Sequence, residues 1–324
     1  MLTLLDEAIY EYRSNRQWGT AHVYRAASRS FTSYLCSDTL SPSALTPALL
    51  KGYESHLRER GLRWNTVATY MKVLKAIYHR AVDRGLTPFV PRLFHSVRTA
   101  PVAESRRALE ACNMRRLLTP VFQDAQPGKT PESPVYRRTR TLFALMFFLR
   151  GIPFVDLIYL RKCDLHDGVL QYRRRKTGRP LAVRLTPEAL ELIRLLQSEP
   201  GARRSPYLLP LLSREEGTEE SYREYQAILR CFNRHLKKLP GQPSGLSLSS
   251  YTARHTWATA AYRCEVHPGV ISEAMGHSSI AVTETYLKPF RDGRIDRANR
   301  QVIDFVMGRP SGKKPRERLS FIEK

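Results

Sequence analysis

The sequence predicts a mainly α-helical protein with one small antiparallel β-hairpin, divided into two domains. Residues 1 to about 95 form four segments in which apolar residues recur three and four positions apart, the spacing of amphipathic helices. Residues 169–185 instead alternate between apolar and polar side chains around Thr177-Gly178, which is the pattern of a hairpin. Between these regions, residues 88–104 contain three prolines and no helical period, so we interpret them as a connection.

The charge balance is the unusual feature of the composition. The chain has 53 Lys plus Arg against 30 Asp plus Glu, a formal net charge of +23. Such a field concentrates polyanions and favours nucleic acid as the partner, the alternative being a basic surface that is only solvated. The five cysteines are scattered and odd in number, which is typical of reduced thiols. With no secretory signal and no apolar window of membrane-spanning length, we expect a cytoplasmic protein without a membrane partner.

Two partial motifs are rejected as cofactor sites. Gly128-Lys129-Thr130 looks like half of a phosphate-binding loop, but position 123 is Gln where the first glycine belongs, and no strand leads into it. Cys231 and His235 are one helical turn apart, but no second pair of metal ligands follows. We therefore expect neither a cofactor nor a metal ion.

The N-terminal region is predicted to be a helix bundle with a basic surface. We expect its four helices over residues 2–17, 20–36, 43–60 and 66–84. The last helix has one apolar face, and its other faces carry Lys72, Lys75 and Arg80. A charged helix face is usually only solvated. In a chain this basic, however, cations on a rigid helix are well placed to pair with the phosphates of double-stranded DNA.

Residues 246–288 begin with a helix whose start is marked by serines. Ser249 or Ser250 can accept hydrogen bonds from the free amides of the first turn, so a helix is expected over residues 251–264. Its apolar spacing places on the inner face Ala253, Trp257, Ala260 or Ala261, and Cys264.

The same stretch holds a dense group of chemically active side chains. Arg254 and His255 lie near the start of the helix, and a short helix over residues 270–275 should end at Gly276. His277 follows directly, and Tyr286 comes nine residues later on a further helix. Each of these residues alone is most often structural, so it is their combination that indicates a site.

The segments RHTWAT and MGHSSIAVTETYLK together resemble the end of the catalytic domain of tyrosine recombinases, the phage integrase family. The family pattern is an Arg-His-Thr-aromatic-Ala-Thr helix start, then Gly-His-Ser-Ser, then a nucleophilic Tyr. The resemblance implies Tyr286 as the nucleophile, Arg254 as the second catalytic arginine and His277 as the His/Trp position. It also implies an integrase-like catalytic domain after a helical core-binding domain.

The first catalytic arginine departs from the family pattern. In the family this junction reads Gly-Leu-Arg, followed three residues later by Glu-Leu. Aligning Asp156 and Leu157 with that Glu-Leu places Pro153 where the arginine belongs. Arg150 lies three residues upstream, about one helical turn, and its long side chain makes it our candidate for the first arginine. The alternative is a helix-terminal cation that satisfies carbonyl groups.

The predicted hairpin is rich in cations. The resemblance implies Lys176, at the edge of its turn, as the residue that protonates the leaving 5′ oxygen. Other cations of the hairpin are expected to bind DNA phosphates, namely Arg173, Arg174, Arg175 and Arg179.

A second departure lies in front of Arg254. The family commonly has His at the position of Tyr251, and a phenol can donate to a phosphate oxygen without carrying positive charge. His255 is a candidate to compensate in part. We therefore expect a divergent but active site.

The implied chemistry explains this set of residues. Attack on a phosphodiester places extra charge on the non-bridging oxygens, which two guanidinium groups and an imidazole can neutralise without a metal. A 3′-phosphotyrosyl bond to Tyr286 conserves bond energy, so religation needs no ATP.

We predict a core-binding domain over residues 1–90, a linker over 91–106, a catalytic domain over 107–308 and a basic tail over 309–324. An amphipathic helix is expected over residues 291–307. It packs either on its own domain or, as the resemblance implies, on a neighbouring subunit in a tetramer that holds two DNA sites.

The function that this implies is site-specific recombination: integration, excision or inversion of DNA. The lack of an obvious arm-binding domain before residue 1 favours a simple invertase or resolution-type enzyme. Two alternatives remain, a type IB topoisomerase-like enzyme with nearly the same residues and a non-catalytic DNA-binding regulatory protein.

Overall fold

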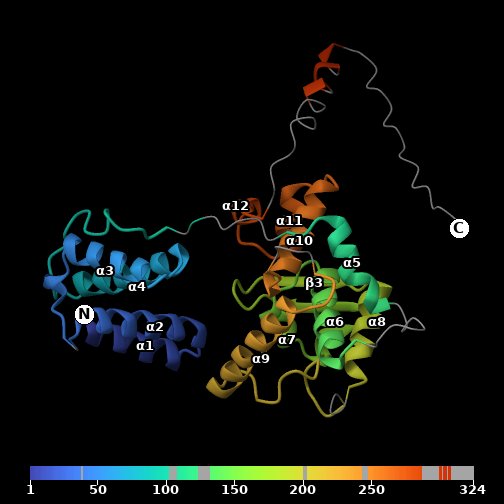
Figure 1. The fold of residues 1–324 in the computed structure, drawn as a ribbon, viewed down its shortest axis with the longest axis horizontal. Helices are drawn as coiled ribbons and strands as arrows, with labels where there is room; N and C mark the ends of the chain where they lie inside the picture. Colours follow the sequence, from blue (N-terminus) through green and yellow to red (C-terminus); the bar gives the residue numbers. More distant parts are fainter. Residues whose placement is uncertain are drawn as a thin grey trace, which may run out of the picture.

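The computed structural model describes residues 1–37, 39–100, 102, 108–122, 132–199, 203–242, 247–286, 299–300, 302–304 and 306–307. Two groups of helices lie side by side (Figure 1). None of the helices in the described part is long and apolar enough to cross a membrane. Residues 123–131, which include Gly128-Lys129-Thr130, and most of the predicted terminal helix lie outside the described residues.

The N-terminal group contains the four helices that the apolar spacing predicts. They are α1 (Leu2–Ser14), α2 (Trp18–Leu35), α3 (Pro47–Glu59) and α4 (Trp64–Asp83), with a short 3-10 helix at Pro42–Ala44. Thr46 caps α3 by accepting from the Leu49 amide at 3.1 Å, and Pro47 occupies the first turn. The sequence therefore marks the start of α3 with the groups that a helix start needs.

The core of this group extends into the stretch interpreted as a connection. Leu93, Phe94 and Val97 are buried against the helices, and the Tyr78 hydroxyl accepts from the Val90 amide at 2.7 Å. The predicted linker over residues 91–106 thus begins inside the first packed unit. Its prolines prevent a helix but leave its apolar side chains able to pack.

The second group is built around α6. The helices of this group are α5 (Ala111–Phe122), α6 (Pro134–Phe148), α7 (Phe154–Ile158), α8 (Pro187–Gln197), α9 (Glu219–Lys237), α10 (Ser250–Arg263), α11 (Pro268–Ala274) and α12 (Ile280–Glu284). Helix α6 contacts α5, α8, α9 and α10 and buries nearly all of its second half. Residues 139–146 of α6 are all buried, Arg140 included, so this part of the helix lies at the centre of the group.

One antiparallel sheet accompanies these helices, with the order β1 (Leu165–His166), β2 (Val169–Arg173) and β3 (Pro180–Arg184). The predicted hairpin is β2–β3, and Gly178 has the positive φ of +70° that its turn requires. Leu170 faces Val183 across the hairpin, and both are buried. The prediction of a mainly helical chain with a small antiparallel sheet is confirmed.

Two details of the last segment differ from the prediction. Tyr286 lies in a turn just after α12, which ends at Glu284. In α10 the buried residues include Thr252, Thr256 and Thr259, whereas Cys264 is exposed. The apolar spacing missed this face because its buried threonines satisfy their hydroxyl groups internally; Thr256, for example, donates to the Thr252 carbonyl at 2.7 Å.

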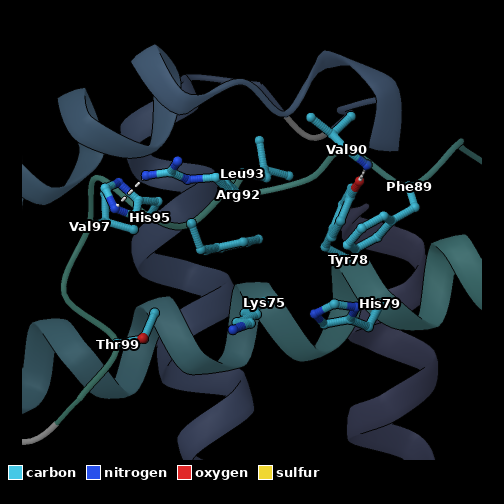
Figure 2. Close-up of a pocket in the computed structure, with 11 residues that line it drawn as sticks. Lys75, Tyr78, His79, Phe89, Val90, Arg92, Leu93, His95, Val97 and Thr99 are labelled. Carbon is cyan, nitrogen blue, oxygen red and sulfur yellow. Dashed lines mark hydrogen bonds between the residues drawn. The ribbon is translucent and has the colours of Figure 1, made fainter.

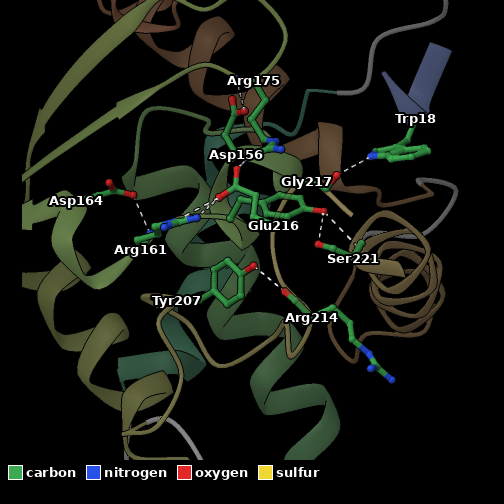
Figure 3. A network of polar contacts seen from close by, with 11 residues as sticks. Trp18, Asp156, Arg161, Asp164, Arg175, Tyr207, Arg214, Glu216, Gly217 and Ser221 are labelled. Atoms are coloured by element: carbon green, nitrogen blue, oxygen red, sulfur yellow. Dashed lines mark hydrogen bonds and ion pairs between the residues drawn. The ribbon is translucent and has the colours of Figure 1, made fainter. Parts of the chain in front are cut away.

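The two groups of helices meet at the loop that precedes α9. The Trp18 indole donates to the Gly217 carbonyl of this loop at 3.3 Å (Figure 3). Next to the loop, Arg13 of α1 pairs with Glu219, the first residue of α9, at 2.5 Å. In the same loop, Glu216 pairs with Arg175 of the hairpin turn. A single loop therefore touches both the N-terminal helices and the hairpin.

The backbone at Gly151 packs tightly against Arg254. Gly151 has a φ of +69°, and a Cβ added there would lie 2.8 Å from the Arg254 Cα. We expect Gly151→Ala to lower the free energy of unfolding by about 2–4 kcal/mol, the sum of a left-handed backbone cost and overpacking. The measurement is urea unfolding.

Gly178→Ala is the matched control. Gly178 has nearly the same φ, +70°, but nothing lies within 4 Å of an added Cβ. It should lose only the backbone contribution, about 1–2 kcal/mol. Equal losses in the two variants would contradict the proposed close packing.

Candidate active site

Arg254 lies at the centre of a buried polar cluster. Helix α10 begins at Ser250 with Ser249 as its N-cap, and this places Arg254 in the second turn with only 3% of its surface exposed. Its Nη1 donates to the Gly151 carbonyl at 2.7 Å and its Nη2 to the Met275 carbonyl at 2.7 Å. Burial lowers the pKa of Arg254, nearby Arg174 lowers it further, and Tyr286 acts in the opposite direction.

His277 is held between two partners. Its Nε2 lies 2.7 Å from Nη2 of Arg254, and its Nδ1 lies 2.8 Å from the Thr283 hydroxyl. Because a guanidinium only donates, Nε2 accepts and the ring proton sits on Nδ1. Burial, followed by the charges of Arg254, Arg174 and Lys176, lowers the pKa of His277 to about 3. The imidazole is therefore neutral and orients Arg254.

Tyr286 joins this cluster through its ring and its backbone. The ring stacks on His277 with centroids 5.2 Å apart and contacts the ring of His255 at 4.4 Å. The Arg254 Cζ lies 5.9 Å from the same ring. The Thr259 hydroxyl of α10 donates to the Tyr286 carbonyl at 3.1 Å, which holds the backbone of Tyr286 itself.

The β2–β3 turn docks on the end of α11. Three successive carbonyls follow the last helical residue, those of the C-cap residue Met275 and of Gly276 and His277. Three hairpin residues donate to them in turn, namely Arg174 at 2.9 Å, Thr177 at 3.3 Å and Arg179. The docking brings Lys176 near enough to His277 to lower its pKa.

Arg174 is the residue whose position the sequence did not predict. We expected it to face DNA phosphates with its neighbours, but only 6% of its surface is exposed. Its Nε lies 2.8 Å from Oδ2 of Asp156, which is 3% exposed in α7. The alternation of β2 was an available signal, since Leu170, Tyr172 and Arg174 fall on one face.

Two further site candidates, Arg150 and Tyr251, make other contacts or face solvent. Arg150, two residues after α6, is half-buried and donates from Nη1 to the Ala182 carbonyl at 3.3 Å. Tyr251, in the first turn of α10, is 51% exposed. The arrangement thus brings together Tyr286, Arg254, His277, His255 and Lys176.

The predicted DNA-binding cations occupy different environments. Lys72, Lys75 and Arg173 are exposed, whereas Arg80 pairs with Glu11 at 2.7 Å. Lys75 lines a cavity of about 420 Å³ between α4 and residues 89–99, together with His79 and Arg92 (Figure 2).

Arg175 is restrained on the outer side of the hairpin. Its guanidinium pairs with Glu216 and lies 4.0 Å from the centre of the Tyr159 ring. Glu216 also holds Arg161 at 2.8 Å (Figure 3), so of the three arginines before Lys176 only Arg173 lacks an ion pair with a described residue.

Arginines, a histidine and a tyrosine gathered in one half-buried cluster define a site for phosphodiester chemistry, and comparison with known proteins agrees. Residues 1–94 match the phage integrase SAM-like domain and residues 128–291 match the phage integrase family. The chain belongs to the phage integrase family. It is a tyrosine-type site-specific recombinase, an enzyme that cleaves and rejoins DNA.

Relatives of known name support the same assignment. The chain is 24% identical over 241 residues to tyrosine recombinase XerA of Thermococcus kodakarensis, covering 72% of this chain and 74% of the relative. It is 21% identical over 282 residues to tyrosine recombinase XerC of Thermodesulfovibrio yellowstonii, covering 82% and 85%.

Solved structures share the fold. A lambda integrase dimer bound to a COC′ core site matches with a TM-score of 0.64 and 16% identity, covering 88% of this chain and 94% of that one. A Tn1549 transposon integrase in complex with transposon right end DNA matches with a TM-score of 0.63 and 15% identity, covering 93% and 99%.

The environment of His277 predicts how stability changes with pH. The folded protein keeps this imidazole unprotonated down to about pH 3, whereas the unfolded chain takes up a proton near the ordinary pKa of 6.5. Between these values the unfolded state binds more protons, so acidification destabilises the fold. The contribution of His277 approaches about 1.4 kcal/mol per pH unit.

His277→Gln should flatten this dependence, because its side-chain oxygen can still accept from Arg254 but does not titrate. The measurement is urea unfolding at about pH 7 and about pH 5. His166→Asn, at an exposed position of β1, is the control and should keep the wild-type dependence. A wild-type slope in His277→Gln would show that this imidazole is not held neutral.

Proposed function

We propose that this recombinase cleaves double-stranded DNA with Tyr286 as its nucleophile. The observation that carries the proposal is the convergence of Arg254, His277 and Tyr286 within one chain, through a 2.7 Å hydrogen bond and a stacked pair of rings. The phenol lies beside the buried guanidinium that would hold the scissile phosphate.

The reaction follows from these groups. The Tyr286 oxygen attacks the scissile phosphorus and gives its proton to water, the bond from phosphorus to the 5′ oxygen breaks, and a 3′-phosphotyrosyl bond forms. Lys176 donates a proton to the leaving 5′ oxygen. Arg254 neutralises charge on the non-bridging oxygens, and His277 fixes its orientation. Attack by another 5′ hydroxyl reverses the sequence and rejoins the DNA.

The exposed cations Lys72, Lys75 and Arg173 supply contacts to the DNA backbone in this proposal. The protein acts in the cytoplasm, in line with its five unpaired cysteines. Assembly is a tetramer on two DNA sites through the terminal helix. Two observations support such docking: Val302, Val306 and Met307 are at least 60% exposed, and lambda integrase was solved as a dimer on a core site.

Covalent capture tests the nucleophile. A pool of nicked duplexes, randomised around the nick, is incubated with protein, and the DNA retained after denaturation is sequenced and resynthesised as one substrate. Wild-type protein should form an adduct that migrates slowly on a denaturing gel. Tyr286→Phe should form none while binding the same duplex with unchanged affinity, since the phenyl ring keeps the stacking.

Tyr262→Phe is the matched control, because Tyr262 packs in the same apolar cluster as Tyr286. It should form the adduct at the wild-type level. An adduct on Tyr286→Phe protein, or its loss in both variants, would contradict the assignment.

The location of Tyr286 beside its own chain's Arg254 predicts cleavage in cis. Arg254→Ala protein retains the nucleophile, and Tyr286→Phe protein retains the phosphate-binding arginine. A mixture of the two should form no more adduct than either alone, because no chain contains both groups. Adduct restored in the mixture would mean that Tyr286 acts on a phosphate held by a neighbouring subunit.

A further inference from the structure

The site as described contains one guanidinium fewer than the chemistry needs. Pro153 stands where the first arginine of the family pattern is expected, as the N-cap of α7. A proline side chain can neither donate a hydrogen bond nor carry charge. The first question is therefore which cation lies beside Arg254.

Arg174 shares an acceptor with Arg254. Its Nη1 donates to the Met275 carbonyl at 2.9 Å, and Nη2 of Arg254 donates to the same oxygen at 2.7 Å. The two guanidiniums therefore converge on one point, although one side chain comes from the hairpin and the other from α10. Arg150 instead donates to the Ala182 carbonyl, on the strand β3.

The shape of the chain around Arg174 fits this placement. A Cβ on Gly276 would lie 2.9 Å from the Arg174 Cγ, so the stem of the arginine packs on the bare backbone just before His277. Its head reaches Asp156, which lies in the first turn of α7, three residues after Pro153. An arginine at position 153 would enter this region from the start of α7. The Arg174 guanidinium enters the same region from the hairpin.

The charges and hydrogen bonds of Arg174 are incompletely satisfied. Its Nε and Oδ2 of Asp156 are 2.8 Å apart, but the N–H is not directed at the oxygen, and both atoms lack a hydrogen-bond partner in the described part of the chain. Two buried guanidiniums, those of Arg174 and Arg254, act on the carboxylate of Asp156. Such a surplus of buried positive charge favours an anion between the cations.

We propose that Arg174 is a catalytic residue that supplies the missing first guanidinium, binding a non-bridging oxygen of the scissile phosphate together with Arg254. This rests on the proposed function, since it assigns a partner to the phosphate that Tyr286 attacks. The long side chain of an arginine allows the same position in space to be reached from a different root in the chain.

A charge-neutral substrate separates this role from a structural one. In a methylphosphonate, a methyl group replaces one non-bridging oxygen at the scissile position, so the cleaved group carries one negative charge fewer. A protein lacking a phosphate-binding arginine should regain cleavage on this substrate. A protein weakened only by distortion should not.

The variant to test is Arg174→Gln combined with Asp156→Asn, because removing the arginine alone leaves a buried, unpaired carboxylate. On the phosphodiester found by covalent capture, we expect adduct formation to slow about a hundredfold or more. On the methylphosphonate we expect most of the lost rate to return. Arg150→Gln is the matched control and should cleave the phosphodiester within a few-fold of wild type. Asp156→Asn alone measures how much of the loss in the double variant comes from removing the carboxylate, and the methylphosphonate should restore none of that part.

Arg174→Lys guards against a failure to fold. It keeps the buried charge but has a single ammonium in place of the planar fork, so it should be slowed on the phosphodiester and partly restored on the methylphosphonate. Circular dichroism and urea unfolding report whether each variant folds.

The outcomes are distinguishable. A wild-type adduct with folded Arg174 variants that are equally slow on both substrates, or as fast as wild type on the phosphodiester, overturns the role of Arg174 alone. Rescue of Arg150→Gln in place of the Arg174 variants assigns the guanidinium to Arg150. No adduct with wild-type protein on either substrate overturns the proposed function and the role of Arg174 with it.

Discussion

One carbonyl oxygen, that of Met275, holds the active-site cluster together. It lies at the end of α11, where carbonyls have no partner within the helix and the helix dipole favours cations. Arg254 and Arg174 both donate to it, at 2.7 and 2.9 Å. Because these arginines come from α10 and from the β2–β3 hairpin, this oxygen links the hairpin, about a hundred residues earlier in the chain, to the consecutive helices α10 and α11. The positive φ of Gly276, +63°, turns the chain there so that His277 enters the same cluster.

This arrangement concentrates positive charge before any DNA is bound. Two guanidiniums near one another in a buried place repel, and Arg174 accordingly helps to lower the pKa of Arg254. Asp156 offsets part of that repulsion, and His277 adds no charge because it is neutral and accepts from Arg254. A bound phosphate would neutralise the positive charge that the protein's own carboxylates do not balance. The transition state carries still more negative charge on that phosphate. The electrostatic cost in the free protein is thus the source of affinity for the reacting group.

The sequence predicted what depends on local rules and missed what depends on contacts between distant segments. Helix starts such as Thr46-Pro47 and Thr186-Pro187 contain their own caps, and α3 and α8 begin there. The hairpin at Thr177-Gly178 was equally local. By contrast, the burial of α10 follows from threonine hydroxyls that bond within the fold, so apolar spacing placed Cys264 inside when it is exposed. Motif matching named Arg254, His277 and Tyr286, whose spacing along the chain is fixed by two short helices.

Arg174 shows why the motif could not complete the site. A family pattern compares positions along the chain, and at position 153 it finds a proline, whereas a phosphate responds to where a guanidinium lies in space. Four consecutive cations, Arg173 to Lys176, look equivalent by composition, yet the strand separates them by alternation. Leu170 and Tyr172 lie on the inner face of β2, and the next residue of that alternation is Arg174. Its side chain therefore points inward, where it donates to the Met275 carbonyl at the end of α11. Position 153 lacks the arginine of the family pattern, and Arg174 is turned inward to the same site. The second feature supplies the positive charge that the first removes, so a divergent sequence retains the chemistry of its family.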